Sequence, residues 1–153
     1  MQFHTWLYPV RGRGSSRITG WKPCNSHISC SYSNQKLFIT CTATGENIKI
    51  RHNFTCKDSN IIYVIQCVKC KIQYIGSTVG NIKSRIDQHR ANLTSGTSPL
   101  YKHFQTNGHK ESDFQFWGLE HVKGDVFILR VRERFWIDKF QVIEKGLNHN
   151  RTS

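Results

Sequence analysis

Three segments of the chain carry the dense pattern of Ile, Val and aromatic residues that predicts buried β-strands. They are Ile61–Cys67, Ile72–Ser77 and Phe114–Val122. Such side chains favour extended backbone because they pack well on a pleated surface. Two shorter pieces, Lys36–Thr42 and Asn47–Arg51, also have strand character.

Capping residues and apolar spacing predict three helices, over about residues 81–93, 99–108 and 125–140. Asn81 and Asp125 stand where a side-chain oxygen can cap the first and the last of them. The element order is then strand, strand, helix, helix, strand, helix. This order predicts an α+β fold with a small, three-stranded, mainly antiparallel sheet flanked by helices.

A hairpin between the first two strands brings two tyrosines together. With Val68 and Lys69 at the turn, Tyr63 lies directly opposite Tyr74 on one face of the sheet. The pair is either an aromatic contact that only packs, or two phenols directed at a common water or phosphate.

The last helix places a carboxylate among apolar side chains. At 100° per residue, Glu133 falls near the centre of a stripe made of Val126, Leu129, Trp136, Ile137 and Phe140. Burying an unpaired carboxylate is costly, so Glu133 needs a cation, a metal ion or hydrogen-bond donors. A structural ion pair with an internal Arg is the plain alternative.

The first helix repeats this pattern with cationic groups. Ile82, Ile86 and Leu93 form its apolar stripe, His89 lies within the stripe and Arg85 flanks it. A single His in such a place is more often a hydrogen-bonded core residue. An Arg, a His, a Glu and two Tyr that all face inward favour a functional site.

Composition and charge narrow the class of protein. Of 153 residues, 37% are hydrophobic, and Lys plus Arg outnumber Asp plus Glu by 22 to 10. The longest apolar run, Ile61–Ile65, is far short of the ~20 residues of a bilayer span, so we expect no transmembrane helix. Residues 47–110 hold ten basic residues against two acidic ones. This excess predicts a polyphosphate partner, with a generic basic surface or an anionic membrane face as alternatives.

The N-terminus lacks the features of a signal peptide, because no positive charge leads it and His4 and Pro9 interrupt its apolar stretch. Residues 1–23 contain several Gly, Ser and Arg and are predicted to be a flexible basic lead-in. Residues 24–58 are predicted to form a Cys-containing linker subdomain.

Six cysteines could make three disulfides, but without a secretory signal clustered cysteines are more typical of metal ligands. Cys67-x2-Cys70 with His103-x5-His109 supplies four ligands suited to structural Zn²⁺. The alternative is two reduced thiols and two surface histidines.

Five ordered positions resemble the GIY-YIG nuclease superfamily over about residues 56–150, which defines a predicted nuclease domain at 59–150. They are Tyr63, Tyr74, Arg85, Glu133 and Asn148, with the expected spacing. Ile61 replaces the first Gly of the name-giving motif, at a position that serves the backbone and not the chemistry.

The resemblance implies a role for each residue in phosphodiester hydrolysis. Glu133 would hold one Mg²⁺ or Mn²⁺ and Arg85 would neutralise the phosphate. Tyr63 would be the general base or orient the water, and Tyr74 would position water or phosphate. His89 would assist Tyr63, and Asn148 would act as a scaffold residue.

Further residues resemble the C-terminal endonuclease domain of Penelope-like retroelements. They are Pro23-Cys24, Phe54–Asn60, Cys67-x2-Cys70, Lys102–Phe104 with His109, and Arg134–Ile137. This resemblance implies structural Zn²⁺ at Cys67, Cys70, His103 and His109. It also implies a second zinc at Cys24, Cys30 and Cys56. The fourth expected Cys is absent, so either Cys41 substitutes for it or this metal site is lost.

The same resemblance implies DNA as partner and a reverse transcriptase in a longer element-encoded protein. A DNA substrate in turn implies action in the nucleus. The short apolar runs predict no membrane partner. Basic residues expected to bind nucleic acid are Lys69, Lys71, Lys83 and Arg90. The leading hypothesis is a metal-dependent DNA endonuclease that nicks DNA for retroelement insertion. The alternatives are a catalytically inactive, zinc-stabilised nucleic-acid-binding module and a disulfide-bonded secreted domain.

Overall fold

The computed structural model describes residues 17, 20–24, 28–106 and 108–149. Most of the predicted lead-in lies outside these residues. A three-stranded antiparallel sheet stands at the centre, in the order β4-β3-β5. Its strands are β3 (Ile61–Cys67), β4 (Gln73–Thr78) and β5 (Phe114–His121). Every side chain of β3 except Gln66 is buried, because this middle strand is covered on both faces.

The predicted register of the β3–β4 hairpin is wrong by two residues. Tyr63 lies opposite Gly76, and Tyr74 lies opposite Ile65. The physical reason is the turn, since Val-Lys suits a two-residue hairpin loop poorly. The chain instead makes a longer loop, in which Lys71 adopts a left-handed backbone conformation with φ of 64°. A shift by two keeps both tyrosines on one face, as predicted.

The two caps that the sequence predicts are confirmed. Helix α1 (Ile82–Asn92) begins after Asn81, whose side chain accepts from Ser84 N, and α3 (Val126–Phe140) begins after Asp125, which accepts from Ile128 N. Helix α2 (Pro99–Phe104) ends earlier than expected. The sequence did not predict α4 (Val142–Lys145), which follows Gln141 in a left-handed conformation with φ of 52°.

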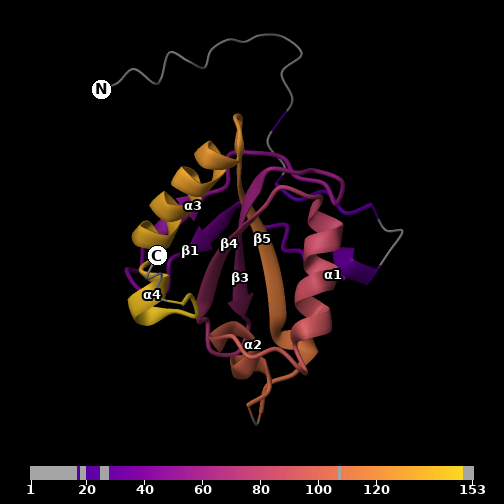
Figure 1. Ribbon diagram of the computed structural model, residues 1–153, viewed down its shortest axis with the longest axis vertical. Helices are drawn as coiled ribbons and strands as arrows, with labels where there is room; N and C mark the ends of the chain where they lie inside the picture. Colours follow the sequence, from indigo (N-terminus) through magenta and orange to yellow (C-terminus); the bar gives the residue numbers. More distant parts are fainter. Residues whose placement is uncertain (1–16, 18–19, 25–27, 107, 150–153) are drawn as a thin grey trace.

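Helices α1 and α3 flank the sheet on either side (Figure 1). Helix α1 covers the tyrosine face, since the His89 ring lies near both Tyr63 and Tyr74. Helix α3 packs against β4 and β3. Strand β4 lies at the edge of the sheet, and side chains from both helices reach its C-terminal end.

The N-terminal part packs on the same core. It forms a two-stranded ribbon, β1 (Phe38–Thr40) with β2 (Asn47–Lys49), and the short 3₁₀ helix η2 (Ile28–Tyr32); a further 3₁₀ turn, η3 (Glu111–Asp113), precedes β5. Buried residues from this part and from the sheet form one hydrophobic cluster. Trp21, which falls within the predicted lead-in, is buried and packs edge-on against Phe116. Among the described residues, no helix is long and apolar enough to span a bilayer.

Candidate active site

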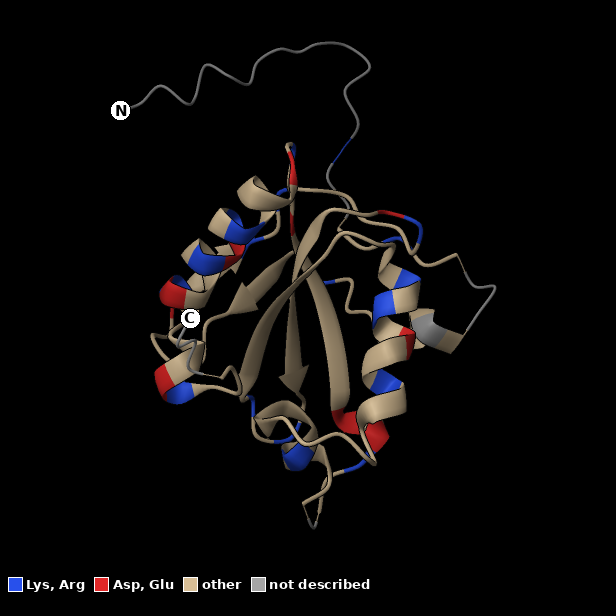
Figure 2. Ribbon diagram, in the orientation of Figure 1, with Lys and Arg blue, Asp and Glu red and all other residues tan. Residues whose placement is uncertain are grey.

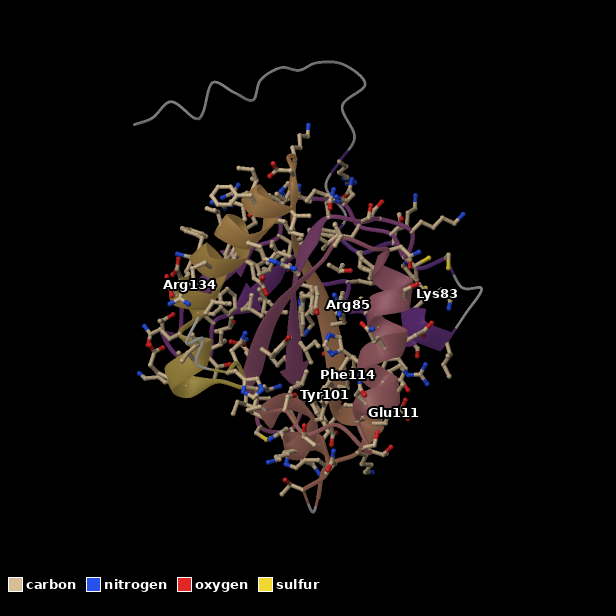
Figure 3. The ribbon with its side chains drawn as sticks, in the orientation of Figure 1. Lys83, Arg85, Tyr101, Glu111, Phe114 and Arg134 are labelled. Atoms are coloured by element: carbon tan, nitrogen blue, oxygen red, sulfur yellow. The ribbon has the colours of Figure 1, made fainter. Side chains whose placement is uncertain are left out.

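Two of the predicted catalytic side chains meet at Ser77, near the end of β4. Arg85 donates from Nη2 to the Ser77 carbonyl oxygen at 3.3 Å, and the Ser77 hydroxyl donates to Glu133 Oε1 at 3.0 Å. The guanidinium comes from α1 and the carboxylate from α3. Figure 3 shows Arg85 on the sheet side of α1, with Lys83 on its outer side. The sequence predicted that Arg85 and Glu133 face inward, but gave no sign that Ser77 joins them.

Glu133 is half-buried, with 12% of its side chain exposed. Its second neighbour is Arg130, which lies 3.4 Å from Oε1 and also donates to Ser77 Oγ at 2.8 Å. Sequence analysis missed Arg130, although a spacing of three residues on a helix is a known ion-pair signal. Donors therefore surround Oε1, as the inward position of the carboxylate required.

The predicted buried stripe of α3 is wrong at one position, Val126. Leu129, Ile137 and Phe140 are buried, but Val126 is 48% exposed. Its neighbours Phe127 and Ile128 are exposed as well. The sheet does not cover the first turn of α3. Helical periodicity cannot show where such cover ends, so the predicted buried face began one turn too early.

Tyr63 is held in a closed pocket with only 1% exposed surface. Its hydroxyl lies 2.8 Å from His89 Nε2, and its ring stacks on Phe116 with centroids 4.7 Å apart. The Tyr74 ring lies 6.5 Å away and is more accessible to solvent. A Cβ at Gly76 would approach the Tyr63 hydroxyl to 2.5 Å, so glycine is required opposite this tyrosine.

The electrostatics of this pair favour neutral groups. Burial, reinforced by Tyr74, raises the pKa of Tyr63 well above its ordinary value, while Arg85 opposes the rise. Burial, with Arg85 as the second cause, lowers the pKa of His89 to about 3. At neutral pH the protein therefore holds an uncharged imidazole against an uncharged phenol, and a nearby cation must stabilise any phenolate that forms.

The contacts continue beyond His89 to a residue that the sequence did not indicate. His89 Nδ1 lies 3.0 Å from the hydroxyl of Tyr101, which belongs to α2. Figure 3 shows Tyr101 at the α2 end of α1. No local sequence pattern predicts this contact, because tertiary packing sets the path of the loop that joins α1 and α2.

Asn148 supports the edge strand through its side-chain amide. Its Oδ1 accepts from Ile75 N at 2.9 Å and its Nδ2 donates to Ile75 O at 2.8 Å. The amide thus takes the place of a neighbouring strand at one residue of β4. This geometry fits the scaffold role that the resemblance implied.

The four predicted zinc ligands form one cluster, with their ligand atoms within 4.8 Å of one another. Cys67 and Cys70 Sγ are 3.8 Å apart, Cys70 Sγ is 3.4 Å from His103 Nε2, and Cys67 Sγ is 3.5 Å from His109 Nδ1. Zn–S and Zn–N bonds in a tetrahedron give about 3.8 Å between sulfurs and about 3.6 Å between sulfur and nitrogen. The cluster therefore fits a zinc ion.

The second predicted metal group has only three described ligands. Cys24 lies 3.4 Å from Cys30 and 3.2 Å from Cys56 between sulfurs. Cys41 is not the substitute ligand that was expected, because it is buried elsewhere with its thiol near Phe140 O. The structure describes all six cysteines, and none of them forms a disulfide.

The basic residues expected to bind nucleic acid differ in their surroundings. Lys69 is exposed and donates to Gly108 O, and Lys83 pairs with Asp87. Lys71 is exposed in the β3–β4 loop. The Arg90 guanidinium is already engaged, since it donates to Glu111 at 2.8 Å and stacks over the Tyr32 ring. Figure 2 shows basic residues on both α1 and α3.

The edge strand of this α+β domain joins a guanidinium and a carboxylate from opposite helices, beside a buried tyrosine and histidine. The family model described as the GIY-YIG catalytic domain matches residues 59–148. The chain belongs to the GIY-YIG family, whose nucleases depend on a metal ion.

Two solved structures share the fold. One is the catalytic domain of homing endonuclease I-TevI, with 24% identity and a TM-score of 0.51 over 59% of this chain and 97% of that one. The other is a mutant of the catalytic domain of intron endonuclease I-TevI, with 21% identity and a TM-score of 0.51 over 60% of this chain and 94% of that one. No match is found among curated proteins.

Proposed function

We propose that the protein is a metal-dependent DNA endonuclease that hydrolyses phosphodiester bonds and leaves nicks. The observation that carries this proposal is the convergence of Arg85 and Glu133 on Ser77. A phosphate at this edge of β4 would meet a cation on one side and a metal-binding carboxylate on the other.

The residues fit a divalent metal ion. Ser77 and Arg130 both contact Glu133 Oε1, while Oε2 accepts no hydrogen bond from the described residues. A carboxylate oxygen is the ligand that Mg²⁺ or Mn²⁺ prefers, usually alongside several waters. When bound, the ion would polarise the phosphate and activate a water.

The remaining steps belong to the chain's own groups. Arg85 would neutralise charge that develops on the phosphate, since a guanidinium matches phosphate oxygens bidentately. Tyr74, the more exposed phenol, would orient the phosphate or the attacking water. Tyr63 would act as the base only as the phenolate, after its own hydroxyl proton has left to solvent, and the Arg85 cation would stabilise that phenolate. The Tyr63 oxygen would then take the proton of the attacking water, with His89 holding that oxygen in place.

Nicking of supercoiled plasmid in the presence of Mg²⁺ tests this function. Glu133→Ala and Arg85→Ala should each abolish nicking, while Glu144→Ala and Arg134→Ala, which remove the same charges from exposed sites on α4 and α3, should not. DNA binding without nicking by the native protein would reject this function and favour the inactive binding module.

We also propose that Cys67, Cys70, His103 and His109 hold a structural zinc that fastens the β3–β4 loop to α2. The interatomic distances support this proposal, and Cys24, Cys30 and Cys56 are a second candidate group. Metal analysis of purified protein should find one zinc that Cys70→Ser removes. A second equivalent, lost in Cys56→Ser, would assign the other group.

The biological setting we propose is the insertion of a Penelope-like retroelement in the nucleus. The support is the set of motifs around Cys67, His103 and Arg134. A nick made by this protein would supply the 3′ end for a reverse transcriptase encoded in the same longer protein. Extension of the nicked 3′ end in a reconstituted reaction tests this, and a blocked 3′ end would contradict it.

A further inference from the structure

A pocket of about 440 Å³ lies between the β1–β2 ribbon and the sheet face opposite the two tyrosines. Side chains alternate along β3, so Gln66, which lines the pocket, points away from the face that carries Tyr63. Gln66 is four residues along β3 from Ile62, the strand partner of Ser77. This separation is about 13 Å, so the pocket is distinct from the proposed catalytic site.

Hydrogen bonds between the ribbon and the sheet fix the orientation of the Gln66 amide. The Thr42 N–H donates to Gln73 Oε1 at 3.1 Å, so the other end of the Gln73 amide is the Nε2 donor. This nitrogen donates to the Thr40 carbonyl oxygen at 2.9 Å and to Gln66 Oε1 at 2.7 Å. The Gln66 oxygen is therefore used within the protein, and its Nε2 donor is left for a ligand.

The Gln115 amide is oriented by a second set of hydrogen bonds. The Lys36 N–H donates to Asn34 Oδ1 at 2.8 Å, and Asn34 Nδ2 donates to Gln115 Oε1 at 3.0 Å. Nε2 of Gln115 is again the end without an acceptor among the described residues. Because Gln66 and Gln115 are partners in the β3–β5 register, their two NH₂ groups belong to neighbouring side chains on one sheet face.

The other residues of the pocket add donors, cations and an aromatic ring. Trp117 lines it with 5% exposure, and its indole N–H has no acceptor in the described part of the chain. Lys36 and Lys71 line it and are exposed, and none of its described lining residues is acidic. Phe38 contributes a ring that is 54% exposed. These groups suit an anionic ligand with a flat ring and neighbouring acceptor atoms.

We propose that this pocket binds one unpaired nucleotide of a nucleic-acid strand, with guanine or cytosine as its base. Guanine presents O6 and N7 as adjacent acceptors and cytosine presents O2 and N3, whereas adenine places its amino donor beside N1 or N7. Gln66 and Gln115 donate to the two acceptors, Phe38 stacks on the base, and the lysines attract the phosphate. A base stacked within a duplex cannot enter such a pocket, so the nucleotide is unpaired.

Binding in this pocket does not depend on the proposed function, because it can be measured without cleavage. Only the expectation that the nucleotide belongs to the nicked DNA rests on that function. A protein that binds the nucleotide but does not nick would therefore leave this inference intact and reject the endonuclease.

NMR titration of the full chain with dCMP, dGMP and dAMP, without divalent metal, tests the proposal. The first two should shift the side-chain NH₂ signals of Gln66 and Gln115 and the indole signal of Trp117, with roughly tenfold higher affinity than dAMP. Inorganic phosphate should leave the glutamine signals in place. Absence of the glutamine shifts, an affinity equal to that of dAMP, or the same shifts with phosphate alone would overturn the proposal.

Variants that exchange a donor for an acceptor sharpen this test. Gln66→Glu keeps an oxygen for Gln73 and replaces the free NH₂ group by a second oxygen, and Gln115→Glu does the same beside Asn34. Each should weaken binding of dCMP and dGMP by roughly tenfold or more, because a donor is lost and a negative charge is added. Gln141→Glu adds the same charge outside the pocket and should have no effect. Unchanged affinity in both pocket variants would contradict the assigned donors.

Phe38 offers a variant in which folding is little affected, because its side chain is largely exposed. Phe38→Ala should weaken nucleotide binding by about tenfold through the loss of stacking. Phe127→Ala, at an exposed aromatic of α3 outside the pocket, is the matched control. Equal affinities for the native protein and Phe38→Ala would overturn the placing of the base in this pocket.

Discussion

At the residue scale, burial keeps two groups of the site, Tyr63 and His89, uncharged at neutral pH. The inward direction of His89 and Glu133 could be predicted, because helical spacing places them among apolar side chains. Two of their partners could not. Ser77 and Tyr101 reach the site from a strand end and a separate short helix, and contacts between elements leave no periodic trace in the sequence. Arg130 lies three residues before Glu133 on the same helix, a spacing that could have indicated the pair.

His89 makes a specific prediction for stability against pH. Its pKa is about 3 in the folded protein and about 6.5 when unfolded, so the unfolded chain binds more protons between these values. The free energy of unfolding should therefore fall by several kcal/mol as the pH drops from about 6.5 toward 3.

Urea denaturation across this pH range measures the effect. His89→Gln should flatten the profile, while His52→Gln serves as a control for a less buried histidine whose pKa is also lowered, chiefly by burial. Parallel profiles for the native protein and His89→Gln would contradict the lowered pKa.

At the element scale, the middle of the sheet was the most predictable part. The bounds of β3 were predicted without error and both helix caps were confirmed, because β-branched runs and capping side chains are local signals. The predicted register of β3 against β4 was wrong, because nothing in the sequence indicates that the backbone of Lys71 adopts a left-handed conformation. Helix α4 was missed for the same reason, at Gln141.

Asn148 carries a prediction at this scale. Asn148→Ala removes two hydrogen bonds to the backbone of Ile75 and leaves the edge of β4 unpaired there. The free energy of unfolding should decrease by about 1–3 kcal/mol. His149→Ala, at the exposed next residue, is the control in the same urea titration. A loss of nicking with no loss of stability would show instead that Asn148 acts in the chemistry.

At the scale of the whole molecule, the proposed function requires the basic charge and the site to serve one substrate, DNA. The sequence contains an excess of Lys and Arg, but it does not show which of these side chains are available to bind DNA. Arg90 is engaged by Glu111 and Tyr32, while Lys69 and Lys71 are exposed on the β3–β4 side. Pairings such as these arise only when distant segments meet.

DNA binding should therefore weaken steeply with salt, and exposed lysines should set the slope. Each phosphate contact contributes about 0.9 to the slope of log affinity against log salt. Lys69→Ala and Lys71→Ala should each reduce the slope by about one, whereas Lys145→Ala on α4 should leave it unchanged. Fluorescence anisotropy with duplex DNA at several salt concentrations measures this, and equal slopes for all variants would contradict a defined DNA-binding face.

The most direct measurement is single-turnover nicking by Glu133→Gln with saturating DNA and Mg²⁺. The amide keeps the size of the side chain and its contact with Ser77, but it is a poor metal ligand. The rate should fall by roughly 10³ or more while DNA affinity stays the same. A rate within about threefold of the native protein would contradict the placing of the catalytic metal at Glu133.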